Sequence, residues 1–446
     1  MRGGYLRVSG AAALSAVTVL ALSGCLAGKA KTAGGLGVNK NTRPTIRIMV
    51  AFGGAQLRAF ASGIEPYAKS RGITIKWADD SNFNADIVTK VKAGNAPDIA
   101  LFPQPGILVQ LAQQGKLADL NKVLPVGRIR SQLVAGLLEP STYRSDVYGV
   151  PASLNLKSVV FYPKKAWARA GYPIPTSLAA LAALDVRMKA DGRTPWCLGV
   201  EDGSATGWSA TDWIEQLLLD QSGTGVYNDW VSHKVKFDSA PVRQAAQYFH
   251  TLFATPGFIH NGRRSITSSY FGTAGNAMFD DKLTESNPGC YMYRQGNFIT
   301  GDGFFPKKII QDLDANVGVF RFPGKSAGDN PVEGGGDVAG LFSGHNKYAI
   351  DLLKHMLTPT FCSVCPRTFA YMSPFTGFAL SNYPDQVARD MAKIAYGATS
   401  FVFDASDSMP GAVGSGTFWR HMTAWIGGHE SLDTALRAID DSWPRS

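Results

Sequence analysis

The sequence predicts an α/β protein in two lobes, each built on an open sheet, with chain segments that cross between the lobes. Short runs rich in β-branched and aromatic residues alternate with helical stretches, an order typical of open sheets covered by helices. The chain is also long for one hydrophobic core, because 422 of its 446 residues remain after a removable leader of 24.

The first 24 residues predict a secretory signal peptide of the lipoprotein type. Arg2 and Arg7 supply a positive n-region, and the apolar stretch 11–22 that follows is too short to span a membrane. The stretch "LSGC" then resembles the bacterial lipobox, whose cysteine receives a diacylglyceryl group before cleavage. Cys25 is therefore the predicted first mature residue and lipid anchor. A buried cysteine after an uncleaved apolar helix is the alternative.

Residues 25–43 predict a flexible tether, because they are rich in Gly, Ala, Lys and Asn and have no apolar periodicity. The tether carries four basic residues, so the formal net charge of +9 falls to about +3 once leader and tether are set aside. The remaining chain has no basic run interleaved with aromatic residues, and this pattern argues against nucleic-acid binding. A basic tether next to an anionic leaflet would add to membrane anchoring.

The first predicted strand is "TIRIMVAF", which alternates apolar and polar residues and is ended by Gly53 and Gly54. Two more strands are predicted in "GITIKWADD" and "APDIALFPQP". Helices separate these strands and are predicted over 55–70 and 106–114. Ligands of open α/β sheets lie at the carboxyl ends of the strands, where Gly53, Gly54, Asp79 and Gln104 stand. These four residues are candidate ligand contacts.

The rest of the chain is richer in helices. Strands are predicted in "YGVPASLNLKSVVFY" and "NVGVFRFPG", and the second is followed by the glycine-rich "EGGGDVAGLF". Helices are predicted over 164–170, 178–191, 211–221, 241–253, 348–357, 385–396, 418–426 and 432–443. Because strands recur between helical blocks, the segments are expected to pass between the two lobes more than once.

Four cysteines follow Cys25 in a chain that is predicted to be exported, where oxidation is permitted. Three disulfide connectivities are possible. We favour Cys197 with Cys290, which leaves Cys362 and Cys365 to close on themselves. Redox chemistry or half of a zinc site is the alternative for this C-x-x-C pair, but zinc needs a second pair of ligands.

Catalytic signatures are weak in this sequence. The seven histidines include no H-E-x-x-H motif and no pair at metal-ligand spacing, and there is no G-x-S-x-G elbow. The stretch "GVFRFPGKS" misses the spacing of a phosphate loop. Carboxylate pairs such as Asp79 with Asp80, or Asp280 with Asp281, keep a glycoside hydrolase open as an alternative. The sequence therefore predicts no enzyme, no cofactor and no metal.

The composition points to carbohydrate instead. Nine tryptophans and fifteen tyrosines accompany many Asn, Asp and Gln residues in a chain predicted to be exported. The apolar face of a pyranose lies flat on an indole, while its hydroxyls need planar donors and acceptors. A single tryptophan is nevertheless more often part of a core than a ligand platform.

In this order, the segments resemble one known family along nearly the whole mature chain. The resemblance rests on the lipobox, "PDIALFPQPGILVQLAQQGKLADL", "YGVPASLNLKSVVFYPKKAW", "GWSATDWIEQLLL", "NVGVFRFPG" with "GGGDVAGLF", and "MPGAVGSGTFWRHMTAWIGG". The chain is identified as resembling the extracellular solute-binding lipoproteins of ABC sugar importers, of the maltose and α-glucoside type. The stretches "PWCLG" and "NPGCYM" resemble the α-glucoside branch and support pairing Cys197 with Cys290.

This resemblance implies a periplasmic-binding-protein-like fold that closes on sugar between its lobes. One lobe would comprise residues 44–153 and 317–342, and the other residues 154–316 and 343–446. In "VPASLNLK" the family places a cleft residue at Asn155, with Lys157 nearby, and its sugar-stacking tryptophan falls on Trp419. A second stacking tryptophan would fall near "MFDDKL", where this chain has none, so Trp208 is the substitute candidate. The predicted ligand-binding residues are Gly53, Gly54, Asp79, Gln104, Asn155, Lys157, Trp208, Asp281, Asp337 and Trp419.

The resemblance also implies a function and partners. The chain is expected to be a monomer on the extracytoplasmic face of a bacterial membrane, where it would capture an oligosaccharide and pass it to ABC permease subunits. An α-glucoside is the expected ligand. The alternatives are a secreted glycoside hydrolase and a binding protein for another solute, such as a glycerol phosphodiester.

Overall fold

The computed structural model describes residues 43–279, 287–326, 328 and 331–444. Its largest sheet has the strand order β2-β1-β3-β12-β6. β1 pairs in parallel with β2 and with β3, whereas β12 runs antiparallel to β3 and β6. The strands are Thr45–Val50 (β1), Thr74–Asp79 (β2), Ile99–Phe102 (β3), Gly149–Pro151 (β6) and Val338–Leu341 (β12). The three strands predicted at the start of the folded chain are therefore confirmed.

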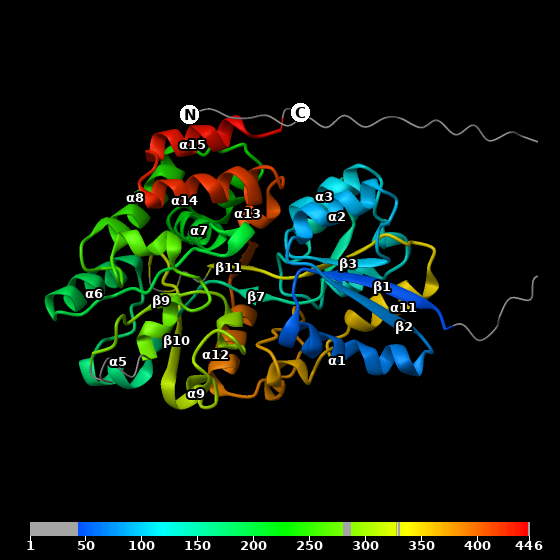
Figure 1. The fold of residues 1–446 in the computed structure, drawn as a ribbon, viewed down its shortest axis with the longest axis horizontal. Coiled ribbons are helices and arrows are strands. Elements are labelled where there is room, and N and C mark those ends of the chain that lie inside the picture. Colours follow the sequence, from blue (N-terminus) through cyan, green and yellow to red (C-terminus); the bar gives the residue numbers. More distant parts are fainter. Residues whose placement is uncertain (1–42, 280–286, 327, 329–330, 445–446) are drawn as a thin grey trace, which may run out of the picture. The chain divides into compact units, whose positions relative to one another are not determined.

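Helices cover both faces of this sheet. Figure 1 shows α1 and α11 on one side and α2 and α3 on the other. Side chains that face the sheet, such as Ile64 of α1 and Leu353 of α11, are fully buried. The helices are Gly54–Ser70 (α1), Phe83–Lys92 (α2), Pro105–Gln113 (α3), Val126–Arg130 (α4) and Lys347–Met356 (α11).

Two three-stranded sheets and a short hairpin complete the strands. β8 lies between β10 and β9 in one sheet, and β11 lies between β13 and β7 in the other. β4 pairs with β5 in a two-stranded hairpin. The strands are Thr142–Tyr143 (β4), Asp146–Val147 (β5), Asn155–Leu156 (β7), Val159–Pro163 (β8), Tyr293–Arg294 (β9), Val317–Arg321 (β10), Pro331–Gly335 (β11) and Ser400–Phe403 (β13).

Residues 152–154 lead from the largest sheet to the β11 sheet, and residues 336–337 lead back from β11 to β12; we call them the crossing segments. The two segments are bonded to each other, because the Ala152 N–H donates to the Asp337 carbonyl oxygen over 2.8 Å and the Asp337 N–H donates to Ser153 Oγ over 2.9 Å. Gly336 has φ +152°, and a Cβ at this position would collide with the Ser153 carbonyl oxygen. Glycine is therefore needed for the two segments to lie this close.

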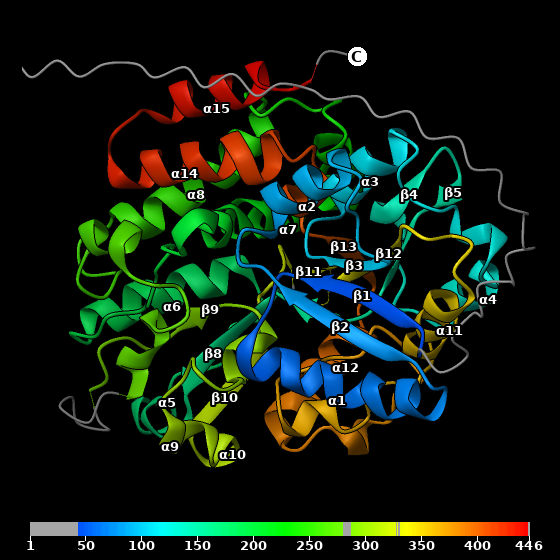
Figure 2. The same ribbon diagram turned by 45° about the vertical axis from the view of Figure 1, so that its right-hand side comes forward.

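The remaining helices lie mostly away from the largest sheet, as Figures 1 and 2 show for α8, α14 and α15. The predicted helix over 211–221 is longer than expected. It begins at Trp208 and resumes beyond a kink at Gly223, where φ is +79°, because Tyr227 and Trp230 are buried past the kink. The helices are Lys164–Ala170 (α5), Leu178–Ala190 (α6), Trp208–Val231 (α7), Ala240–Ala254 (α8), Lys307–Ile310 (α9), Leu313–Asn316 (α10), Gln386–Tyr396 (α12), Ala405–Ser408 (α13), Trp419–Gly427 (α14) and Leu432–Asp441 (α15).

The described chain contains two hydrophobic cores, as a two-lobe fold requires. The first gathers around Ile48 and Leu101 of the largest sheet, and the second around Trp213, Phe249 and Trp425. The predicted α/β, periplasmic-binding-protein-like fold class is confirmed. The lobe boundaries stay a prediction. β10 pairs with β8, although the prediction assigned these two strands to different lobes.

Both predicted disulfides are present. Cys197 bonds to Cys290 with Cα atoms 5.5 Å apart, and Cys362 bonds to Cys365 with Cα atoms 5.1 Å apart. The leader, Cys25, the tether up to residue 42, and Asp281 lie outside the described residues. Among the residues that are described, no helix is long and apolar enough to cross a membrane.

Candidate functional site

Candidate residues at the carboxyl ends of β1 and β2 lie against one another. Gly53 precedes α1, and a Cβ at this position would lie 2.8 Å from Asp79 Oδ2. Glycine therefore lets the exposed Asp79 carboxylate approach the backbone. Gly54 has φ +56°, a conformation that favours glycine. The next residues along the chain then turn directly into α1.

Asn155 and Asp337 line one small cavity of about 20 Å³ beside the crossing segments. Phe52 and Gln56 line the same cavity, so the start of α1 reaches it. Asp337 Oδ2 accepts a hydrogen bond from Ser153 Oγ over 2.7 Å. Burial raises the pKa of Asp337 to about 6, although the Ser153 hydrogen bond acts in the opposite direction.

Gln104 joins the first sheet to the far side of the crossing segments. It precedes α3, and its Nε2 donates to Asp407 Oδ1 of α13 over 3.0 Å. The backbones meet next to this bond, because a Cβ on Gly106 would collide with the Met409 carbonyl oxygen. The N-terminus of α3 therefore packs directly against α13.

Lys157 lies immediately after β7 and is 5% exposed. Its Nζ donates to Asp212 Oδ1 of α7 over 3.1 Å and also to Asp404 Oδ2. The same ammonium lies 4.8 Å from the centroid of the Trp208 ring. One buried cation thus connects the strand after the crossing segment to α7 and to the end of β13.

A second buried cation, Arg294 of β9, extends these contacts. Its Nη2 donates to Glu333 Oε2 over 2.8 Å, and its Nη1 lies 3.6 Å from Asp212 Oδ2. Glu215 accepts the backbone N–H of Ala405 over 2.6 Å. We call this set the ion network; its members are Lys157, Asp212, Glu215, Arg294, Glu333, Asp404 and Asp407.

The ion network contains five carboxyl groups but only two cations. Burial would lower the pKa of Lys157, but the carboxylates around it outweigh burial and raise that pKa well above its usual value. Burial raises the pKa of Asp212 to about 7, against the opposing charge of Lys157. The pKa of Asp404 is lowered instead, because the charge and hydrogen bond of Lys157 overcome its burial. Burial also raises the pKa values of Glu215, Glu333 and Asp407.

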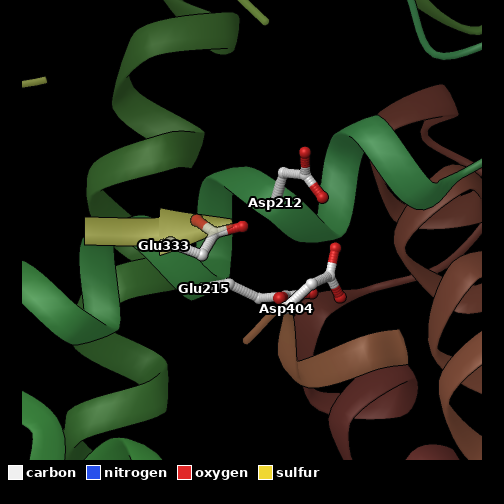
Figure 3. Close-up of side chains that lie close together, drawn as sticks. All are labelled: Asp212, Glu215, Glu333 and Asp404. Carbon is white, nitrogen blue, oxygen red and sulfur yellow. The ribbon is translucent and has the colours of Figure 1, made fainter. Parts of the chain in front are cut away.

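Four of these carboxylates, Asp212, Glu215, Glu333 and Asp404, place one oxygen each within 4.8 Å of one another. Figure 3 shows the four side chains close together. Oxygen ligands at this spacing would suit a hard cation such as Ca²⁺. Lys157 and Arg294 already provide positive charge to three of them. The arrangement is therefore an ion-pair network among the protein's own groups.

Trp208 and Trp419 lie near each other, each at the start of a helix. A Cβ on Gly207 would collide with the Trp419 carbonyl oxygen. Trp208 is half-buried and donates from Nε1 to Asp202 Oδ2 over 2.8 Å. Trp419 is only 4% exposed, and its Nε1 donates to Ser406 Oγ over 3.0 Å. Its stacking role, like the other predicted ligand contacts, stays a prediction.

Comparison with known proteins identifies the chain. Residues 53–360 match the family model for bacterial extracellular solute-binding proteins. The chain belongs to this family. The curated relatives of this solute-binding protein include the osmoprotective compounds-binding protein GgtB of Synechocystis sp., 33% identical over 92% of this chain and 95% of the relative. The α-glucosides-binding periplasmic protein AglE of Rhizobium meliloti is 30% identical over 90% of this chain and 87% of the relative.

Solved structures show the same fold. The solute receptor AcbH, described with a preference for β-D-galactopyranose, has a TM-score of 0.71 and 20% identity over 90% of this chain and 97% of that one. The sugar-binding protein MalE of Xanthomonas citri has a TM-score of 0.67 and 14% identity over 89% of this chain and 95% of that one.

Sequence reasoning missed most of the ion network in this solute-binding protein. Only Lys157 was singled out, and as a ligand contact. A signal was available in "TDWIEQLLL", where Asp212 and Glu215 stand three residues apart in an otherwise apolar helix. Charged residues on a buried helix face need partners, but the sequence does not show that Arg294 and Glu333 supply charges from distant strands.

The ion network predicts that stability depends on pH. Between the usual carboxyl pKa near 4 and the raised pKa of Asp212 near 7, the folded protein holds a proton that the unfolded chain has lost. The free energy of unfolding should therefore fall as pH rises through this window, by up to about 1.4 kcal/mol per pH unit for each such proton. Asp212→Asn should flatten this slope in denaturant melts between pH 4 and 7. Asp229→Asn, at an exposed ion pair, is the control, and an unchanged slope in Asp212→Asn would contradict the assignment.

Trp419→Ala tests whether this ring is part of the core. Because Trp419 is buried, the substitution should lower the free energy of unfolding by about 3 to 5 kcal/mol in denaturant melts. Trp425→Ala, on the same helix and also 4% exposed, is the matched control for a purely structural loss. If Trp419 also stacks on sugar, calorimetric titration of the folded variant should show a further loss of about 1 to 3 kcal/mol of affinity that Trp425→Ala lacks. Wild-type stability in Trp419→Ala would show that the core assignment is wrong.

Proposed function

We propose that this chain is the lipid-anchored substrate-binding protein of an ABC importer, and that it captures a neutral carbohydrate, an α-glucoside oligosaccharide, between its lobes. The observation that carries this proposal is the match to the solute-binding family along most of the chain. A relative named for α-glucosides and a relative named for osmoprotective compounds both align over about nine-tenths of it. The protein would bind and release its ligand without chemical change.

The charges around the crossing segments support a neutral ligand. Lys157 is the only cation among the predicted ligand contacts, and Asp212 and Asp404 already pair with it. Asp79 and Asp337 add only carboxyl groups. A phosphodiester would need a cation that is free to bind it, so this charge distribution disfavours the phosphodiester alternative. Sugar hydroxyls, in contrast, donate readily to carboxylates.

A small osmoprotective solute is the second candidate ligand. It is favoured by GgtB, which is named for osmoprotective compounds and is 33% identical to this chain. Sugars such as sucrose and trehalose fit both candidates, so the ligand panel has to include an osmoprotectant that is not a sugar.

A thermal-shift panel tests the proposed ligand class. Maltose, sucrose and trehalose should include at least one ligand that raises the melting temperature, since saturation at 100 times Kd stabilises a protein by about 2.7 kcal/mol. Glycine betaine and glycerophosphoglycerol should leave the melting temperature unchanged. Stabilisation by glycerophosphoglycerol alone would favour the phosphodiester alternative. Release of glucose from any disaccharide would favour a hydrolase instead.

The lipid anchor is part of the proposal and is supported by the n-region, the short apolar stretch and the "LSGC" sequence. A thioether-linked diacylglyceryl group together with an amide-linked chain would give firm attachment, since each buried methylene adds about 0.8 kcal/mol of membrane affinity.

Cys25→Ala should move the protein out of the membrane fraction or leave it as an uncleaved precursor, because the thiol that accepts the lipid is gone. Fractionation followed by mass spectrometry of the N-terminus measures both outcomes. Cys362→Ser with Cys365→Ser is the control for loss of cysteine as such. Normal processing and full membrane retention in Cys25→Ala would contradict lipid anchoring.

A further inference from the structure

Tyr270 is the most exposed Phe, Tyr or Trp in the part of the chain that the structure describes, with 39% of its surface accessible. Single exposed apolar side chains are common and need no explanation. Tyr270 is different because its ring belongs to a contiguous group of partly exposed rings. Such patches mark binding surfaces more often than isolated residues do.

Five rings form this group, which we call the aromatic shelf: Trp208, Tyr270, Phe271, Phe298 and Phe304. Phe271 is buried at its centre, with ring centroids 4.8 Å from Tyr270, 4.8 Å from Trp208 and 6.0 Å from Phe304. Phe298 lies 5.9 Å from Trp208 and 6.1 Å from Phe304. Trp208, Phe298 and Phe304 are half-buried.

Two glycines allow these rings to lie against the backbone. A Cβ on Gly272 would lie 2.5 Å from the Tyr270 ring and 2.8 Å from the Phe304 ring. A Cβ on Gly296 would collide with the Phe298 ring. Because Gly272 lies between Tyr270 and Phe304, any larger residue there would push the two rings apart.

Two carboxylates lie beside the shelf. Glu201 Oε1 accepts the Gly203 N–H over 2.8 Å, and Asp202 Oδ2 accepts the Trp208 Nε1–H over 2.8 Å. The backbone of Glu201 is bonded to that of Phe271, so these carboxyl groups are held next to Tyr270. Among the described residues, the second oxygen of each carboxyl group has no hydrogen bond, and both side chains are partly exposed.

The shelf adjoins the crossing segments. Trp208 contacts the Lys157 ammonium, and Asn297, the neighbour of Phe298, accepts the Leu156 N–H of β7 on Oδ1 over 2.8 Å. Lys157 lies over the Trp208 ring, and Phe271 and Phe298 pack against that ring in edge-to-face geometry, so several protein groups already contact Trp208. Within the part of the chain that the structure describes, no cation lies over the ring of Tyr270 or Phe304.

We propose that Tyr270 and Phe304 are the ring-stacking residues of the ligand site and that Glu201 and Asp202 accept hydroxyl groups of the same sugar. An exposed aromatic ring bordered by hydrogen-bond acceptors matches a pyranose, which has one C–H face and hydroxyls at its edge. This inference rests on the proposed function and deepens it. It also assigns the aromatic contact that Trp208 was expected to provide to two residues that no family motif indicates.

Calorimetric titration with maltose, sucrose and trehalose tests the assignment. Tyr270→Ala should weaken binding of the disaccharide that stabilises the wild type by about 5-fold to 100-fold, the range seen for aromatic stacking contacts. Tyr270→Phe keeps the ring and should stay within about 2-fold of wild type. Phe304→Leu, which is less disruptive than alanine at a half-buried position, should also weaken binding. Melting temperatures without ligand should show that each variant is folded.

Ile174→Ala is the matched control, because Ile174 is 42% exposed and belongs to neither the shelf nor the ion network. Wild-type affinity in both Tyr270→Ala and Phe304→Leu would overturn the inference while leaving sugar binding established. If the two variants keep wild-type affinity but no longer support sugar uptake in membrane vesicles, the shelf contacts the permease instead of the sugar, and the inference is also overturned. If none of the three disaccharides binds the wild type, the proposed function itself is wrong. The titration of the wild type alone shows this, so the two failures can be told apart.

Discussion

The buried ammonium of Lys157 is the charge around which the centre of this molecule is organised. It pairs with Asp212 and Asp404, which come from α7 and from the end of β13. The desolvation cost of these groups is offset only while all of them are present, and loss of one partner from such a buried pair typically costs about 3 to 5 kcal/mol. The ammonium of Lys157 therefore links the residue after β7 to α7 and to the end of β13.

The same interaction constrains what the neighbouring surface can bind. Because both carboxylates pair with Lys157, its ammonium is not available to bind a charged ligand. The other polar side chains nearby, such as Asp202 and Asp337, are mainly hydrogen-bond acceptors. Burial raises the pKa of each of these two carboxyls to about 6. Near neutral pH they accept hydrogen bonds readily, and hydroxyl donors are the ligand groups that match them.

Local patterns predicted the fold well. Apolar alternation marked β1, and the predicted helix over 164–170 is identical to α5. Errors appeared where distant contacts decide the structure: α7 continues beyond the predicted end because Trp230 is buried on the far side of the Gly223 kink. The Cys197 to Cys290 pairing was predictable because only three connectivities existed and local motifs favoured one of them.

The site was predictable only in part, for a related reason. Residues at strand ends, such as Gly53 and Asp79, follow from the rule that governs open sheets. Asn155 and Trp419 came from a resemblance, and burial of Trp419 could not be seen in its sequence context. The ion network joins residues up to 247 positions apart, as in the bond between Lys157 and Asp404, and no local pattern specifies such a pair.

Trp208 shows how the ion network and the aromatic shelf act on each other. Its ring lies beneath the Lys157 ammonium, its indole N–H is bonded to Asp202, and Phe271 packs against it in edge-to-face geometry. A tryptophan held on three sides is poorly suited to adapt to a ligand, but it is well suited to keep its neighbours in place. Two carboxylates fix the position of Lys157. Lys157 contacts Trp208, Trp208 packs against Phe271, and Phe271 packs against Tyr270, so the position of each ring depends on the one before it. In this arrangement the buried charges determine where the exposed ring stands, and the exposed ring is left free to meet the ligand.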